Sequence, residues 1–326
     1  MLNLRTALFA ALFIQLLVSC KKDDDQPLPS IAAIAVANAN FSTLESAAVQ
    51  GGVAVVLSNP NPGDPSGAFT VFAPDNAAFA RLGFNSGDDL PTLQPEFLTN
   101  TLLYHVSNGN LAGSSIREGG MVASALGPSC RFVSRGADRY INGSKILATD
   151  VAAQNGTVHI IDKVLLATGT DIVQSALALK DSKVFRGPEL SYLVEAVLYA
   201  ELADALSATP GSPSFTVFAP SDAAFRQLGA DLGVPLNTPA DVRKLPKDVV
   251  TAVLLNHVIA DGGKFTSEMN AGMVAPLGGI NLNIGAFNNG TLTVKGAGNA
   301  AAANMLIPDV LTTNGVVHVI DRVLLP

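Results

Sequence analysis

The chain has 326 residues, a formal net charge of −7, two cysteines and no tryptophan. This length suits two domains of ordinary size. The acidic balance argues against nucleic-acid binding, which depends on basic patches that neutralise phosphates. It also provides no basic strip for an anionic membrane surface.

The N-terminal residues predict export and lipid attachment. Arg5 precedes an apolar stretch, residues 6–18, which is shorter than the ~20 residues that a spanning helix needs and suits a signal peptide. A Leu-Val-Ser-Cys motif ends at Cys20 and matches the bacterial lipobox. We therefore expect residues 1–19 to be a lipoprotein signal peptide and Cys20 to carry the lipid, with enough acyl methylenes for stable anchoring.

The residues after Cys20 predict a short tether. Residues 20–29 contain two lysines, three consecutive aspartates and two prolines, a composition too polar to fold. The acidic tract resembles that of surface-exposed lipoproteins of Bacteroidetes, which implies a lipid-anchored position on the outside of the outer membrane. A plain linker on a periplasm-facing lipoprotein is the alternative. No other segment approaches 18 uninterrupted apolar residues, so we expect the lipid to be the membrane contact.

The remainder of the chain repeats itself. Three blocks recur in the same order, at residues 69–79 and 215–225, 102–106 and 254–258, and 155–162 and 314–321. The spacing between copies grows from 146 residues at Phe69 and Phe215 to 159 at His159 and His318. The pattern indicates a duplication in which the two copies differ by small loop insertions and keep their elements in the same order.

Each block predicts a local structure. The first, Phe-Thr-Val-Phe-Ala-Pro, predicts a strand ended by proline, after which Asp75 or Ser221 caps a helix. The second predicts an amphipathic helix with His105 or His257 on its apolar side, near its end. The third opens with Asn-Gly, a hairpin signal, and continues into a strand rich in valine and isoleucine.

The order of these blocks resembles the fasciclin-type adhesion domain, over roughly residues 30–326. The resemblance implies an α+β fold class with two tandem fasciclin-like domains, each a compact β-wedge or sandwich packed with several helices. We predict a first domain over residues 30–167 and a second over 168–326. The short junction at residues 168–171 favours a fixed arrangement of the two.

The resemblance also supplies candidate binding residues. A Tyr-His motif in this family is tied to receptor binding, which makes Tyr104 and His105 candidates for ligand contact. The second copy has Asn256 and His257 at these positions, and the asparagine weakens the case there. The alternative is that both histidines are core residues with hydrogen bonds to the backbone.

Catalytic, cofactor and metal sites are not predicted. His159 and Asp162 are three residues apart, which in a strand places them on opposite faces and argues against a catalytic dyad. Nucleophile-elbow, phosphate-loop, zinc and calcium motifs are not found in the sequence. For Cys130 we expect a buried, small apolar role, with a reactive or intermolecular thiol as the alternative.

These observations predict a non-catalytic, surface-anchored adhesion module that binds a protein or an extracellular matrix polymer. A polysaccharide-binding accessory lipoprotein for glycan uptake is the alternative. The absence of tryptophan and the low number of tyrosines, four, disfavour it, since sugar platforms depend on exposed aromatic rings. A hydrolase is the third hypothesis, because a fold does not exclude chemistry.

Overall fold

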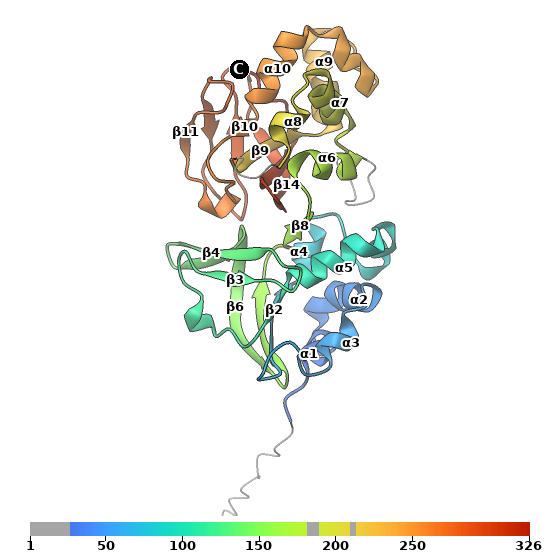
Figure 1. The fold of residues 1–326 in the computed structure, drawn as a ribbon, viewed down its shortest axis with the longest axis vertical. Helices are drawn as coiled ribbons and strands as arrows, with labels where there is room; N and C mark the ends of the chain where they lie inside the picture. Colours follow the sequence, from blue (N-terminus) through green and yellow to red (C-terminus); the bar gives the residue numbers. More distant parts are fainter. Residues whose placement is uncertain (1–26, 181–188, 209–212) are drawn as a thin grey trace, which may run out of the picture.

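The computed structural model describes residues 27–180, 189–208 and 213–326. The predicted signal peptide, Cys20 and most of the predicted tether lie outside the described residues. The described chain forms two α+β units that lie end to end, with residues 27–30 entering at one end and Pro326 near the other (Figure 1). No helix among the described residues is long and apolar enough to cross a membrane.

The first unit combines short helices with one extended sheet. Its helical segments are α1 Ile31–Ala37, η1 Ala39–Phe41, α2 Ser42–Gln50, α3 Ala54–Leu57, α4 Asn76–Ala80, η2 Gly87–Thr92, α5 Pro95–Tyr104 and η3 Gly113–Ser115. Its strands are β1 Phe69–Pro74, β2 Val106–Asn108, β3 Met121–Ala123, β4 Ser129–Arg135, β5 Asp138–Ile141, β6 Ser144–Ala153, β7 Gly156–Ile161 and β8 Leu166–Ala167. The sheet has the order β2-β1-β7-β6-β5-β4-β3, with β1 and β7 parallel.

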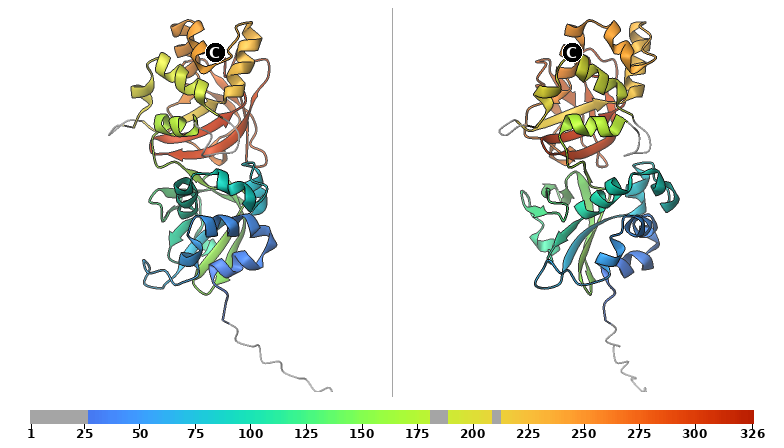
Figure 2. Two further views of the ribbon diagram at one scale, coloured as in Figure 1. Left: turned by 90° about the vertical axis from the view of Figure 1, so that its right-hand side faces the viewer. Right: turned by 45° about the vertical axis from the view of Figure 1, so that its right-hand side comes forward.

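The second unit repeats this plan. Its helical segments are α6 Ile172–Lys180, α7 Ser191–Tyr199, α8 Ala203–Leu206, α9 Asp222–Leu232, η4 Pro239–Lys244, α10 Lys247–Leu255 and η5 Thr266–Glu268. Its strands are β9 Phe215–Pro220, β10 Val258–Ile259, β11 Gly272–Val274, β12 Leu282–Ile284, β13 Thr293–Lys295, β14 Ala303–Thr312 and β15 Gly315–Ile320. The order β10-β9-β15-β14-β13-β12-β11 reproduces the first sheet strand for strand. Each sheet curves into a barrel-like wall with helices packed beside it (Figure 2).

The first repeated block forms the predicted strand and helix cap. All residues of β1 and β9 are buried. Asp75 Oδ1 accepts a hydrogen bond from Ala78 N at 2.8 Å, and Ser221 Oγ accepts one from Ala224 N at 3.3 Å. These bonds satisfy amides in the first turn of α4 and α9, so both predicted caps are confirmed.

The Asn-Gly block forms the predicted hairpin in both units. Gly156 has a φ of +145°, and a Cβ atom there would lie 1.9 Å from the Phe69 carbonyl oxygen. The asparagine side chain also reaches the first helix of its own unit. Asn155 Oδ1 accepts from Ile31 N at 2.9 Å, as Asn314 Oδ1 accepts from Ile172 N at 3.0 Å. The block therefore closes a strand pair and fixes the start of α1 or α6.

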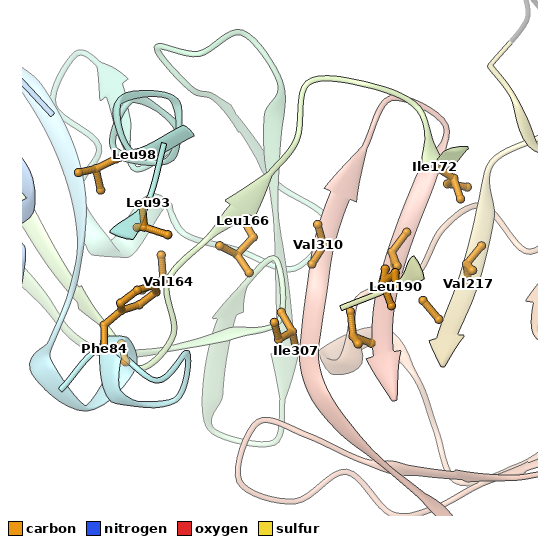
Figure 3. Close-up of a cluster of buried hydrophobic side chains, with 14 of the residues drawn as sticks. Phe84, Leu93, Leu98, Val164, Leu166, Ile172, Leu190, Val217, Ile307 and Val310 are labelled. Carbon is orange, nitrogen blue, oxygen red and sulfur yellow. The ribbon is translucent and has the colours of Figure 1, made fainter. Parts of the chain in front are cut away.

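A single cluster of buried apolar side chains extends through both units. Figure 3 shows Leu93 and Val164 on one side of Leu166, and Ile307 and Val310 on its other side. Leu166 belongs to β8, the strand that leads from the first unit to the second. The hydrophobic core is thus continuous across the junction, and we expect the two units to move together.

Candidate functional site

Tyr104 lies inside the first unit. Its side chain is almost fully buried at the end of α5, and its hydroxyl oxygen accepts a hydrogen bond from Asn142 Nδ2. Burial raises the pKa of Tyr104, so the phenol remains protonated. Cys130 lies beside it with its Sγ atom 4.0 Å from the Tyr104 carbonyl oxygen. The thiol is buried, as predicted, and burial raises its pKa to about 12, which keeps it unreactive.

His105 and His257 make the same contacts in the two units. His105 Nδ1 donates to Thr101 O at 2.6 Å, and its Nε2 accepts from Leu165 N at 2.9 Å. His257 likewise bonds Val253 O at 2.7 Å and Leu324 N at 2.8 Å. One ring nitrogen must carry hydrogen and the other must not, which defines a neutral tautomer. Burial lowers the pKa of each ring to about 4.

Asn256 differs from Tyr104, the residue at the equivalent position of the first unit. Its side chain is fully buried where the first unit has Tyr104. Neither its amide oxygen nor its amide nitrogen has a hydrogen-bond partner among the residues that the structure describes. The substitution therefore removes the phenol and leaves an unsatisfied amide in the core.

The four predicted ligand-binding residues lie at equivalent positions of the two units, at the end of a core helix. Tyr104, His105, Asn256 and His257 are buried, and the histidines connect a helix end to the segment that follows β7 in the first unit and β15 in the second. The contacts that the structure describes are structural. A direct role of these residues in ligand binding stays a prediction.

His159 and His318 also have matching environments. Their Nε2 atoms donate to Leu111 O at 2.9 Å and to Lys264 O at 3.0 Å, while their Nδ1 atoms accept backbone amides. Asp162 instead accepts from Lys145 N at 2.6 Å, on the neighbouring strand. The histidine and the aspartate therefore form hydrogen bonds with different backbone groups.

The junction between the units contains a shared strand pair. Strand β8 pairs in parallel with β14, with Leu166 opposite Val310 and Ala167 opposite Leu311. The next amide, Thr168 N, donates to Leu311 O at 3.0 Å. A strand of the first unit therefore joins the second sheet by pairing with β14.

A buried ion pair lies beside this strand. Lys163 Nζ is 2.5 Å from Asp309 Oδ2 and 2.6 Å from Gly290 O. The other carboxylate oxygen, Asp309 Oδ1, accepts from Thr266 N at 2.6 Å. The ammonium and the carboxylate thus both have several partners, which compensates for the loss of water around them.

Arginines of the first unit extend the contact. Arg131 donates to Gly263 O at 2.8 Å, pairs with Glu268 at 2.9 Å and covers the ring of Phe265. Arg135 donates to Ser267 O and Met269 O, at 2.9 and 2.7 Å. All of these bonds reach η5 and the residues beside it, so strand β4 of the first unit places two guanidinium groups against one loop of the second.

Sequence reasoning missed these junction residues. A usable signal was present, because Lys163 immediately follows the third repeated block, where the second copy has Arg322. Asp309 has a counterpart in Asp150, and both have positive φ, 68° and 64°, at an irregular position of an otherwise regular strand pair. A polar residue kept at one position in both copies could have been singled out.

Each unit also has an apolar cavity beneath its first helices. The cavity beside α1 and α2 measures about 70 Å³ and includes Val36, Val49 and His105 in its lining. Its counterpart beside α6 and α7 measures about 60 Å³ and includes His257. Among the described residues, no group of three or more histidine, cysteine, aspartate or glutamate side chains could hold a metal ion.

These features define a class of protein: a tandem pair of equivalent α+β domains with a continuous core and a buried, charged junction. The profile of the fasciclin domain family matches residues 39–167 and 188–326. The chain belongs to the fasciclin domain family, and the predicted fold class is confirmed.

Individual relatives match most of this chain. Transforming growth factor-beta-induced protein ig-h3 of Sus scrofa is 30% identical over 80% of this chain and 35% of its own length. Human periostin is 28% identical over 80% of this chain and 28% of its own length. The chain thus spans about a third of the length of these curated relatives. A solved FAS1 domain pair from the insect cell adhesion molecule fasciclin I aligns at 18% identity and a TM-score of 0.40, over 90% of this chain and 96% of that chain.

Proposed function

We propose that this protein is a non-catalytic adhesion module that holds a protein or matrix polymer at the cell surface. The observation that supports it best is the fixed junction in a fasciclin domain pair. Because Lys163, Asp309 and the shared strand pair hold the domains together, exposed surfaces of both domains keep a constant spacing. A ligand that contacts both domains then loses less conformational entropy on binding than it would with flexibly linked domains.

The contacts of the four histidines agree with a protein that is not an enzyme. All four rings donate to or accept from backbone groups through both nitrogens, and the pKa of each is lowered by burial. A general base needs a free nitrogen within reach of substrate. We therefore assign the histidines to structure.

The proposal includes a lipid anchor at Cys20. The lipobox and the acidic tract support attachment to the outer membrane with the domains facing outward. In this arrangement the second domain lies farther along the chain from the membrane than the first. We propose that it presents the outermost surface to a ligand.

The experiment compares cells that carry the wild-type chain, a deletion of its gene, or the Cys20→Ala variant. Attachment to protein-coated and polysaccharide-coated surfaces is counted, and protease treatment of intact cells measures surface display. We expect both altered strains to lose attachment to a protein-coated surface. Normal attachment by the deletion strain contradicts the proposal.

A second measurement separates adhesion to protein from glycan binding. The chain from residue 26 is applied to a glycan array and to immobilised matrix proteins. Saturable binding to a glycan with none to protein favours the accessory lipoprotein. Binding to protein that the Asp309→Ala variant weakens supports a composite surface that depends on the junction.

A further inference from the structure

The helices nearest the N-terminal end differ from their counterparts in the second domain. Between Pro27 and Gly63, the only charged residue is Glu45. In the second domain, the matching helices α7 and α8 and the loop between them carry Glu195, Glu201 and Asp204. Both glutamates form ion pairs, Glu195 with Arg243 and Glu201 with Lys247.

Large apolar side chains project from these helices, in which Glu45 is the one charged residue. Val36 of α1, Val49 of α2 and Val55 of α3 are 63%, 67% and 72% exposed, and Leu28 and Val56 are also exposed. Val36 and Val49 line the 70 Å³ cavity together with Ala54, the residue before Val55. Since α1, α2 and α3 pack against one another, we name the exposed apolar side chains on and beside these helices the valine face: Leu28, Val36, Val49, Val55 and Val56.

The valine face is at the anchor end of the molecule. In Figures 1 and 2, α1 and α3 lie at the end of the first domain opposite the second domain, where residues 27–30 enter. Pro27 is seven positions after Cys20, a span of at most about 25 Å. A lipid on Cys20 therefore keeps the valine face close to the bilayer surface.

We propose that the valine face contacts the lipid bilayer and fixes the orientation of the domain pair on the membrane. This proposal rests on the anchor at Cys20 that is part of the proposed function. Glu45 is the one charged side chain of these helices, so the free-energy cost of removing polar groups from water is small when the apolar side chains enter the headgroup boundary, to a depth of ~5–10 Å. The second domain, with acidic residues on the matching helices, remains in water.

The chain offers a clean spectroscopic test because it contains no tryptophan. One tryptophan is introduced at Val49→Trp or Val55→Trp, both exposed positions with room for the larger ring. The matched control is Leu198→Trp, on α7 near its C-terminal end as Val49 is on α2, and 52% exposed. Circular dichroism verifies that each variant remains folded.

The anchor is supplied chemically, so the test does not depend on lipidation in the cell. The thiol of Cys20 in residues 20–326 is coupled to a maleimide lipid in vesicles of phosphatidylethanolamine and phosphatidylglycerol with brominated acyl chains. Cys130 does not compete, since it is buried and its pKa is raised to about 12. Loss of cell adhesion in the Cys20→Ala strain is a separate measurement, so either proposal can fail alone.

Bromine quenches tryptophan only at short range, so emission reports bilayer contact. We expect the tryptophans at positions 49 and 55 to lose at least about half of their emission, with a blue shift, and the one at 198 to be unaffected. Adding Val36→Asp to the Val55→Trp variant should restore most of the emission. Equal quenching at positions 49 and 198, or none at 49 and 55, overturns the proposal.

Discussion

Lys163 and Asp309 form an ion pair between the two domains, with side chains only 9% and 6% exposed. They are 146 residues apart, and Asp309 has its positive φ in an irregular part of β14. Gly143 of the first domain allows this approach, since a Cβ atom there would lie 2.2 Å from Asp309 Oδ2. The junction is therefore formed by backbone geometry as well as by charge.

Removing one member of this pair should destabilise the junction. Asp309→Ala leaves the Lys163 ammonium buried without its counter-charge, and we expect a loss of about 3 kcal/mol in the free energy of unfolding. The double variant with Lys163→Met should recover most of the loss. Denaturant unfolding measures both. Lys145→Met, which breaks the exposed pair with Asp138, is the control and should leave the midpoint unchanged.

The buried histidines should make the protein sensitive to acid. The pKa of His105 and of His257 is about 4 in the folded protein, below the ordinary value of 6.5. Stability is therefore complete above pH 6.5 and is lost as the pH falls toward 4, because the unfolded chain takes up protons first. Each ring should lower the free energy of unfolding by about 2 kcal/mol when the pH falls from 7 to 5.

Nuclear magnetic resonance and unfolding curves test this pH dependence. The ring protons of His105 and His257 should show no titration above pH 5 in the folded protein. The loss of stability on acidification should become smaller when either histidine is replaced by glutamine. Rings that titrate near pH 6.5 while the protein is folded would contradict the assignment.

Asn256→Leu should stabilise the second domain. The leucine keeps a similar volume and removes an amide without hydrogen-bond partners among the described residues, so we expect a gain of about 1 kcal/mol. The change at the equivalent position, Tyr104→Phe, should instead cost about 1 kcal/mol, because it removes the bond to Asn142. Thermal unfolding of both variants measures the two effects. Midpoints that shift in the same direction would contradict the prediction.

Gly156→Ala should weaken the first domain severely. The added methyl group would collide with the carbonyl of Phe69 on the parallel strand. Together with backbone strain, this collision should lower the free energy of unfolding by about 3 kcal/mol. Gly52→Ala is the control: it also has positive φ, but no atom lies within 4 Å of its Cβ position. Its cost should be about 1 kcal/mol.

The fold could be predicted because its signals are local and occur twice. Strand alternation, the caps at Asp75 and Ser221, and the Asn-Gly turns depend on neighbours in sequence. The junction depends on residues more than a hundred positions apart, such as Arg131 and Glu268, and no periodicity encodes such a contact. The burial of Tyr104 was likewise hidden, because a residue at the end of an amphipathic helix can face either way.

Strand β8 has a mechanical consequence if the chain is anchored and adhesive as proposed. If the membrane pulls on the first domain and a ligand pulls on the second, tension passes through residues 166–167 and their partners on β14. Parallel strands pulled at opposite ends are loaded along their length, so their hydrogen bonds must shear together and cannot open one by one. Lys163 lies three residues before that pair, where it adds resistance on the side of the membrane. The junction would act as a mechanical coupling, in which the strand pair and the ion pair both oppose separation of the domains.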